Sequence, residues 1–299
     1  MNFWKEWTTI NIARLNSIFS PENIEFHTID YSDKLMLIRL ASKWHIQPTY
    51  LVDSIGPDEA LATINFVKNE KCLISQISAV IPALECETDY FQKTLGLSKY
   101  WKRSSYYSIA LSGGSAEHVL AGMESRQRSK VRNKADSFSV EQIAFKEIHA
   151  SIFAEQQIVW GVSKLNFFSS NDLMLIANKF QTKLWKITCG NSEVLYLLII
   201  ESFQEAYFFL SATTNSKARE ASLFAHWKII NNLIERNYKW YHLGGGVTSG
   251  DGIERFKRSL GANEINRRLY PFTLNEEFAG NYFPNWLEQI MLPVNVKSF

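Results

Sequence analysis

The chain of 299 residues is long enough to form one large domain or two modest ones, each with a real hydrophobic core. Hydrophobic residues make up 46% of it and charged residues 21%, which excludes a disordered or fibrous protein. The 32 basic and 30 acidic residues give a net charge of +2, so bulk charge predicts neither a nucleic-acid nor a membrane partner.

Cysteine usage and the lengths of apolar runs narrow the setting further. Cys72, Cys86 and Cys189 are odd in number and far apart, which argues for a reducing compartment and against a disulfide framework or a zinc ribbon. The longest purely apolar run near the middle of the chain, Val194–Ile200, is far shorter than a membrane span. We therefore expect a cytoplasmic protein with no membrane span and no metal.

The first part of the chain is predicted to alternate between short helices and short strands. The pattern predicts a helix over 1–19, which Pro21 ends, and a short helix over 89–97. Strands are predicted at 35–40, 50–53, 73–80 (before Pro82) and 106–111. A glycine-rich break at 112–115 follows, and Ser115 is suited to cap a helix over 116–135. This break divides the chain into an N-terminal domain, 1–112, and a C-terminal domain, 113–299.

The second part shows clearer periodicity. It predicts a strand over 138–145, helices near 147–160 and 171–181, and an antiparallel meander of three strands over 183–189, 194–201 and 206–212. A polar loop over 213–219 then leads into a helix over 220–237, a buried strand over 240–243, a short helix over 253–259 and a last strand over 264–270. The predicted fold class is α+β with mixed, mainly antiparallel sheets.

Glycine usage singles out one segment. The chain has 14 glycines, where average usage of about 7% would give roughly 21, yet six of them lie between Gly244 and Gly261. Three of these, Gly244, Gly245 and Gly246, directly follow the predicted buried strand, so the backbone there can approach a ligand closely or adopt positive φ. The short helix after them offers free N–H groups to a carbonyl oxygen, an oxyanion or a phosphate.

The order of elements and motifs over residues 115–271 resembles the Fem-type aminoacyl- and peptidyltransferases of the GNAT (acyl-CoA N-acyltransferase) superfamily. Leu243, Gly244 and Gly245 match the family's strand that ends in Leu-Gly-Gly, and Phe256-Lys257 and Gly261 match its short Phe-Lys helix and nearby glycine. The resemblance implies two GNAT-like domains in tandem, of which the N-terminal one is degenerate.

The resemblance and the chemistry of the side chains together suggest roles around the glycines. Lys257 would stabilise an oxyanion or a phosphate, and Phe256 would pack beside it and contact substrate. Asp251 could accept a proton from an attacking amine, although an aspartate before a helix also serves as an N-cap. His242 could act as a general base, although a lone histidine on a buried strand is also a common core residue.

Two basic segments are predicted to meet phosphates. Five charges fall within nine residues, Arg126–Lys134, with few acidic neighbours, and the resemblance implies that Arg128 and Arg132 contact a nucleotide-linked acceptor or a tRNA acceptor end. The loop over 212–221 contains no glycine, unlike the pyrophosphate loop of acetyl-CoA enzymes. Lys217 and Arg219, at the start of the following helix, could still bind the phosphates of a donor cofactor.

The resulting hypothesis is transfer of an acyl or aminoacyl group to an amine acceptor by direct attack on an activated carbonyl. The donor would be acyl-CoA or aminoacyl-tRNA, and the acceptor a cell-wall precursor, an amino sugar, a lipid-linked intermediate or another small or nucleotide-linked molecule. Two alternatives stay open: an ordinary acyl-CoA-dependent N-acetyltransferase, and a non-catalytic module that binds a nucleotide-sugar or RNA.

Overall fold

The computed structural model describes most of the chain from residue 103 to residue 273 and several strands before it. The described ranges are 24–30, 36–42, 45–52, 78–84, 103–134, 137–162, 167–190, 192–213, 218–245 and 251–273, with seven helical residues between 6 and 17. The predicted helix over 89–97 lies outside them.

The chain divides into two compact units, which are described separately. Unit 1 comprises residues 1–104, 163–166 and 266–299, and unit 2 comprises residues 105–162 and 167–265. The division into domains at residue 112, which rests on the glycine-rich break, stays a prediction.

Unit 1 contains a sheet of five strands in the order β1-β2-β3-β4-β11. They are β1 (Ile24–Asp30), β2 (Met36–Ser42), β3 (His45–Val52), β4 (Ser78–Leu84) and β11 (Asn263–Thr273, of which residues 266–273 belong to unit 1). All neighbours are antiparallel except β3 and β4. We expected a strand to end before Pro82, which was wrong: Pro82 lies inside β4, opposite Leu269. The described pairing of β4 with β3 covers only Ser78–Val80, so at Pro82 the strand has β11 as its described neighbour and tolerates the missing N–H.

Unit 2 is built on a mixed sheet whose strand order is β5-β10-β9-β8-β7-β6. The strands are β5 (Arg103–Ala110), β6 (Ser139–Ile143), β7 (Gln181–Cys189), β8 (Ser192–Ser202), β9 (Glu205–Thr213) and β10 (Trp240–Gly245). Strands β6 to β9 are antiparallel neighbours, which confirms the predicted meander. Strand β10 is antiparallel to β5 and parallel to β9, because the connection from β9 to β10 passes through a helix.

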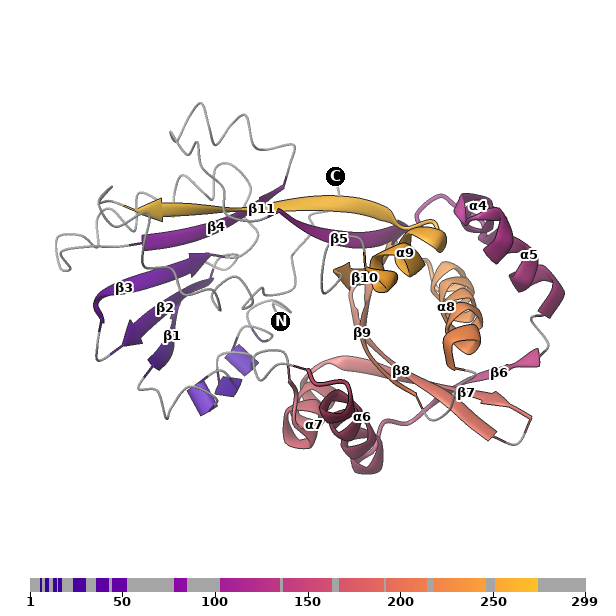
Figure 1. The fold of residues 1–299 in the computed structure, drawn as a ribbon, viewed down its shortest axis with the longest axis horizontal. Helices are drawn as coiled ribbons and strands as arrows, with labels where there is room; N and C mark the ends of the chain where they lie inside the picture. Colours follow the sequence, from indigo (N-terminus) through magenta and orange to yellow (C-terminus); the bar gives the residue numbers. More distant parts are fainter. Residues whose placement is uncertain are drawn as a thin grey trace. The chain divides into compact units, whose positions relative to one another are not determined.

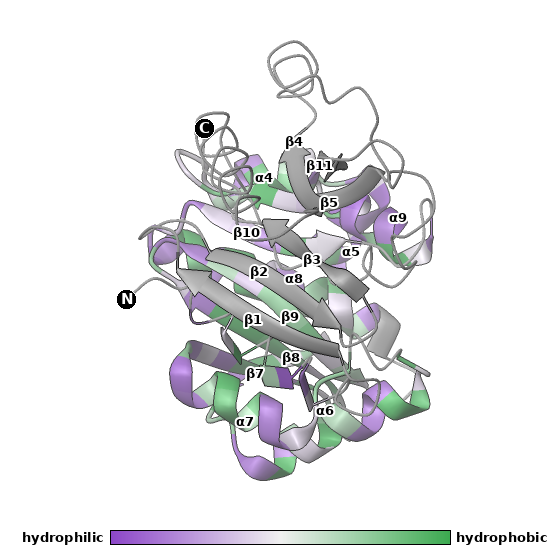
Figure 2. Cartoon of the chain, turned by 90° about the vertical axis from the view of Figure 1, so that its left-hand side faces the viewer, coloured by the Kyte–Doolittle hydropathy of each residue, from purple (hydrophilic) through white to green (hydrophobic). Residues whose placement is uncertain are grey.

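Helices cover both faces of this sheet (Figure 1). Helices α6 (Glu147–Val159) and α7 (Ser170–Lys179) pack on one face, around a cluster that includes Phe153 and Leu198. Helices α4 (Ala116–Gly122), α5 (Ser125–Lys134), α8 (Ala218–Glu235) and α9 (Gly252–Ser259) belong to the other face, whose larger cluster includes Tyr107 and Tyr241. Green and purple residues alternate along α6 and α7 in Figure 2, as expected for helices with one buried side.

The single helix predicted over 116–135 was wrong, because the chain forms two helices there. Met123, at the end of α4, has extended backbone angles, φ −70° and ψ 155°, and α5 starts two residues later. The predicted N-cap is confirmed: the Ser115 hydroxyl accepts a hydrogen bond from the backbone N–H of His118. In the part of the chain that the structure describes, no helix is both long and apolar enough to span a membrane.

Gly261 fits against the break between α4 and α5. Its φ is +80°, and a Cβ there would lie 2.8 Å from the backbone carbon of Gly122 and 2.9 Å from its oxygen. Neither contact can relax without moving backbone. Gly261 is therefore required both by its conformation and by the space around it.

We expect Gly261→Ala to lower the free energy of unfolding by about 2–4 kcal/mol, the combined scale of a left-handed non-glycine residue and an overpacked contact. Gly122→Ala is the matched control, because a Cβ there meets nothing within 4 Å. Chemical denaturation of the two variants measures the difference. An equal loss of unfolding free energy in the two variants would contradict the structural requirement for glycine at position 261.

Candidate functional site

Helix α9 begins at an ordinary cap but buries unusual residues. Asp251 caps it, with a side-chain oxygen that accepts a hydrogen bond from the backbone N–H of Glu254 at 2.7 Å. Glu254 and Lys257, about one turn apart, are both buried, whereas Ile253 is 46% exposed. A surface helix normally buries its apolar side and exposes its charges. The burial of these two charged side chains makes this side of α9 a candidate site.

Strand β10 reaches this helix through a β-bulge. His242 pairs with Ser108 of β5, but Gly244 pairs with the very next residue of β5, Tyr107. Gly244 has a φ of +72°, and a Cβ on it would lie 3.8 Å from the Lys257 amine. Glycine here permits the bulge and leaves the space beside the amine open.

The pairing between β10 and β9 stops just before this point. Trp240–His242 pair with Glu205–Tyr207, while β9 continues as a partner of β8 up to Thr213. Among the described residues, Leu243–Gly245 do not pair with β9. Strands β9 and β10 therefore separate where the glycines begin. Beyond His242 the described backbone groups of β10 form no ladder hydrogen bonds with β9.

The Lys257 amine lies at the end of β10 (Figure 1 shows α9 beside this strand). Lys257 is only 5% exposed, and its Nζ donates a hydrogen bond to the carbonyl oxygen of Gly245 at 2.6 Å. Burial lowers the pKa of Lys257 to about 8, partly opposed by the negative charges of Asp251 and Glu254. Among the described residues, the amine has one hydrogen-bond partner, a backbone carbonyl. It is therefore suited to donate a further hydrogen bond to an oxygen atom of a substrate.

The lowered pKa of Lys257 predicts how stability depends on pH. Between pH 8 and the ordinary lysine value of 10.5 the unfolded chain binds a proton that the folded protein does not, so stability rises with pH across this window. We expect the free energy of unfolding of the wild type, relative to Lys257→Met, to rise by about 3 kcal/mol from pH 8 to 10.5. Urea denaturation across this range measures it. A constant difference would contradict the burial of the amine.

His226 of α8 lies on the same side of the sheet as Lys257. Its Nδ1 forms a 2.8 Å hydrogen bond with the Tyr241 hydroxyl, and its ring is 5.7 Å from that of Phe256. Burial, with a smaller effect from the charge of Lys257, lowers the pKa of His226 to about 3, so the ring is neutral at neutral pH. Phe256 packs against the core cluster beside this pair.

His242 lies on the opposite face of β10, as strand alternation from Tyr241 requires. Its ring stacks on that of Tyr207 at 4.6 Å, and its Nε2 is 3.6 Å from a carboxylate oxygen of Glu205. Burial raises the pKa of Glu205, but the nearby His242 ring and a hydrogen bond from the Tyr207 hydroxyl outweigh it and lower the pKa overall. The arrangement can orient an imidazole, but on a different face from Lys257.

The basic helix α5 has structural contacts of its own. Arg128 donates to the carbonyl oxygens of Ala121 at 2.7 Å and Met123 at 2.6 Å, and so satisfies the end of α4. Arg132 forms an exposed ion pair with Glu117 at 3.3 Å. The predicted phosphate contacts of both arginines stay predictions, and so do the substrate contacts of Phe256.

Three other predicted residues fall wholly or partly outside the described part of the chain. Gly246 and Lys217 lie outside it. Arg219 lies in the first turn of α8, and the structure does not describe its side chain. Within the described residues, no group of three or more His, Cys, Asp or Glu side chains is placed to hold a metal ion.

Two residues of this region were missed by the sequence analysis. His226 lies three residues before the buried Ile229 in α8, so helical spacing alone places it on the buried side of the helix. Glu205 immediately follows the turn between β8 and β9, and nothing in a single sequence marks its approach to His242.

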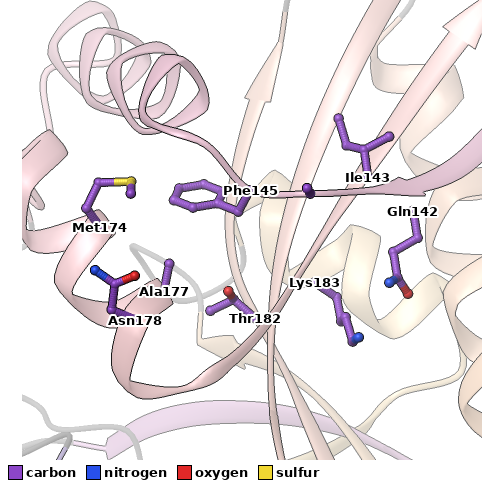
Figure 3. Close-up of a pocket in the computed structure, with 9 residues that line it drawn as sticks. Gln142, Ile143, Phe145, Met174, Ala177, Asn178, Thr182 and Lys183 are labelled. Carbon is purple, nitrogen blue, oxygen red and sulfur yellow. The ribbon is translucent and has the colours of Figure 1, made fainter.

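A cavity of about 410 Å³ lies on the α7 side of unit 2 (Figure 3). It forms where the chain leaves the sheet after β6, and its walls come from β6, α7 and β7. Phe145, Met174 and Ala177 supply apolar wall, while Gln142 and Lys183 extend together away from them (Figure 3). None of the predicted site residues lines it.

Comparison with solved structures places this geometry in a known fold. A crystal structure of FemX matches with a TM-score of 0.62 at 11% identity, over 91% of this chain and 96% of that one. The chain has a Fem-like GNAT-type fold. The predicted fold class is thereby confirmed. No family model and no curated protein matches the sequence.

Two further structures with this Fem-like GNAT-type fold match at 11% identity. One is the C-terminal domain of a protein assigned as a lysylphosphatidylglycerol synthetase from Agrobacterium fabrum, with a TM-score of 0.57 over 88% of this chain and 92% of that one. The other is L-PGS from Bacillus licheniformis, with a TM-score of 0.54 over 86% and 90%. At this identity the likeness is one of fold.

Proposed function

We propose that the protein transfers an acyl or aminoacyl group to an amine acceptor. The observation that carries the proposal is the buried Lys257 amine beside Gly244 and Gly245, at the point where β10 parts from β9. The shared fold supports it, because two of the similar structures are a FemX and an L-PGS.

The chemistry follows from what this position offers to a carbonyl. The acceptor nitrogen attacks the carbonyl carbon and forms the new C–N bond, and negative charge develops on the carbonyl oxygen. A Lys257 ammonium placed against that oxygen would stabilise it in a site from which water is largely excluded. The C–S or C–O bond to the donor then breaks, and the amine proton ends on the leaving thiol or hydroxyl. No covalent enzyme intermediate is needed.

The donor and the acceptor are proposed only by class. The donor is an acyl-CoA thioester or an aminoacyl-tRNA ester, and the phosphates of either would meet the N-terminus of α8, with Lys217 and Arg219. The acceptor is an amine on a cell-wall precursor, an amino sugar or a related nucleotide-linked molecule, with Arg128 and Arg132 as its proposed phosphate contacts. A cytoplasmic location is proposed with these substrates.

A donor panel tests the proposal. The purified protein is incubated with short acyl-CoAs or with aminoacyl-tRNAs, each with amino sugars and nucleotide-linked amines, and mass spectrometry follows the acceptor. A mass increase equal to the acyl or aminoacyl group is expected with one donor class. Transfer from acetyl-CoA alone would identify an ordinary N-acetyltransferase. RNA or nucleotide-sugar binding without any transfer would contradict the proposal and favour a binding module.

A further inference from the structure

When an amine attacks a carbonyl, its nitrogen must lose a proton for the new amide to form. This problem arises only if the proposed function holds, and the inference below rests on it. The sequence suggested Asp251 or His242 as the base. In the structure Asp251 caps α9 through its side chain, and His242 lies on the opposite face of β10 from Lys257. Asp251 is thus engaged as a cap, and His242 faces away from Lys257.

The surroundings of the Lys257 amine contain few charges. On α8, the neutral His226 interacts with it electrostatically, and on β10 its hydrogen-bond partner is the backbone carbonyl of Gly245. On α9 itself Asp251 and Glu254 act on it through their charges, yet within the described residues no carboxylate lies at ion-pair distance from Lys257. Residues 246–250 contain no ionisable side chain. Burial outweighs the two carboxylates, so the net effect is to lower the pKa of Lys257.

Packing fixes this amine in place. The hydrogen bond to Gly245 holds Nζ at the end of β10, and the absent side chain of Gly244 leaves the adjoining space open. His226, on which the charge of Lys257 acts, is hydrogen-bonded to Tyr241, and both of these side chains are buried. An amine in such surroundings can exchange a proton near neutral pH, as general acid–base catalysis requires.

We propose that Lys257 carries the proton of the reaction from the attacking amine to the leaving group. Neutral Lys257 accepts the proton from the acceptor nitrogen as the C–N bond forms. The resulting ammonium then lies against the carbonyl oxygen at the moment that this oxygen becomes negative. When the C–S or C–O bond breaks, the ammonium returns the proton to the departing sulfur or oxygen, and Lys257 is neutral again. Protons and electrons balance with no further reactant.

Lys257→Arg separates this role from simple oxyanion stabilisation. Arginine keeps a positive hydrogen-bond donor but does not release its proton in proteins. We expect kcat for Lys257→Arg to fall about as far as for Lys257→Met, within roughly threefold, and kcat of the wild type to rise with pH toward a plateau above about pH 8. Retention of a tenth or more of the wild-type kcat by Lys257→Arg, together with a near-total loss in Lys257→Met, would overturn the proton role.

Lys257→Arg could also lose activity because arginine does not fit the site. A direct titration of Lys257 in the wild type tests the proton role without that substitution. The ¹³Cε shift of Lys257, assigned by comparison with Lys257→Met, follows its protonation in the full-length protein without substrate. A midpoint near pH 8 is expected, and a lysine that stays charged up to pH 10 would overturn the inference. If the wild type transfers no acyl group from any donor, the proposed function itself fails, and the proton role with it. Transfer with a flat pH profile sinks the proton role alone.

Discussion

Lys257→Met is expected to lower kcat for acyl transfer about 10²–10³-fold, the effect typical of losing one preorganised donor at an oxyanion. Methionine matches the length of the lysine stem and removes only the amine, so the contacts of α9 with the core should persist. The KM for the donor should change little, because the amine acts on charge that develops in the transition state. Steady-state kinetics with the donor found in the panel measure both constants.

Arg255→Met is the matched control for this change. Arg255 lies on the same helix two residues before Lys257, but it is exposed. It should keep kcat within a factor of two or three of the wild type. An equal loss of kcat in the two variants would mean that removing any positive charge from α9 impairs activity, with no specific role for Lys257. Full activity in Lys257→Met would remove the lysine from the mechanism.

Arg236→Leu is expected to lower the free energy of unfolding by about 3 kcal/mol, because it strands a buried carboxylate. Arg236 makes two hydrogen bonds of 2.6 and 2.7 Å to the two oxygens of Glu201, whose side chain is 2% exposed. Tyr238 completes the cluster, with its hydroxyl 2.9 Å from both partners. These residues tie the end of β8 to the chain that follows α8 and leads into β10.

Arg132→Leu provides the comparison. It also breaks an arginine–glutamate pair, but both side chains of that pair are more than half exposed. An exposed pair contributes about 0–1 kcal/mol, so this variant should unfold almost like the wild type. Urea denaturation of both variants under one buffer gives the difference. A loss for Arg236→Leu no larger than that for Arg132→Leu would contradict a structural role for the buried cluster.

Local patterning predicted much of unit 2 correctly. The alternating runs over 183–212 fold into the expected meander, since each strand joins its neighbour through a short turn and the pairing needs no distant information. The helix that includes Ile253–Ser259 was also found, because Asp251 before it is a strong start signal. These elements are encoded by residues close together in the chain.

Long-range packing decided what the sequence could not. The break between α4 and α5 accommodates Gly261, which is more than a hundred residues away. Arg128 was expected to contact phosphate from the charge run and the resemblance, and its hydrogen bonds to the carbonyls of Ala121 and Met123 were not foreseen. Strand β1 was not predicted at all, and its ladder with β2 is what reveals it. Contacts between residues far apart in the chain produce no local sequence pattern from which they could be predicted.

The candidate site shows the same division. The glycines and Lys257 were predicted from spacing and resemblance, and the structure places Gly244 and Gly245 beside the Lys257 amine. Strand alternation predicts that Tyr241 and His242 lie on opposite faces of β10. It does not predict which of the two faces α8. The hydrogen bond between His226 and Tyr241 resolves that choice.

A structure of the protein with a non-transferable donor analogue would test the proposed site most directly. The analogue keeps the carbonyl of the donor that supports transfer and replaces its scissile sulfur or oxygen with a methylene group. We predict that its carbonyl oxygen lies within about 3 Å of Lys257 Nζ, beside Gly244 and Gly245, in the distance range of an oxyanion donor. An analogue bound with its carbonyl on the His242 face of β10, or away from β10 altogether, would contradict the assignment.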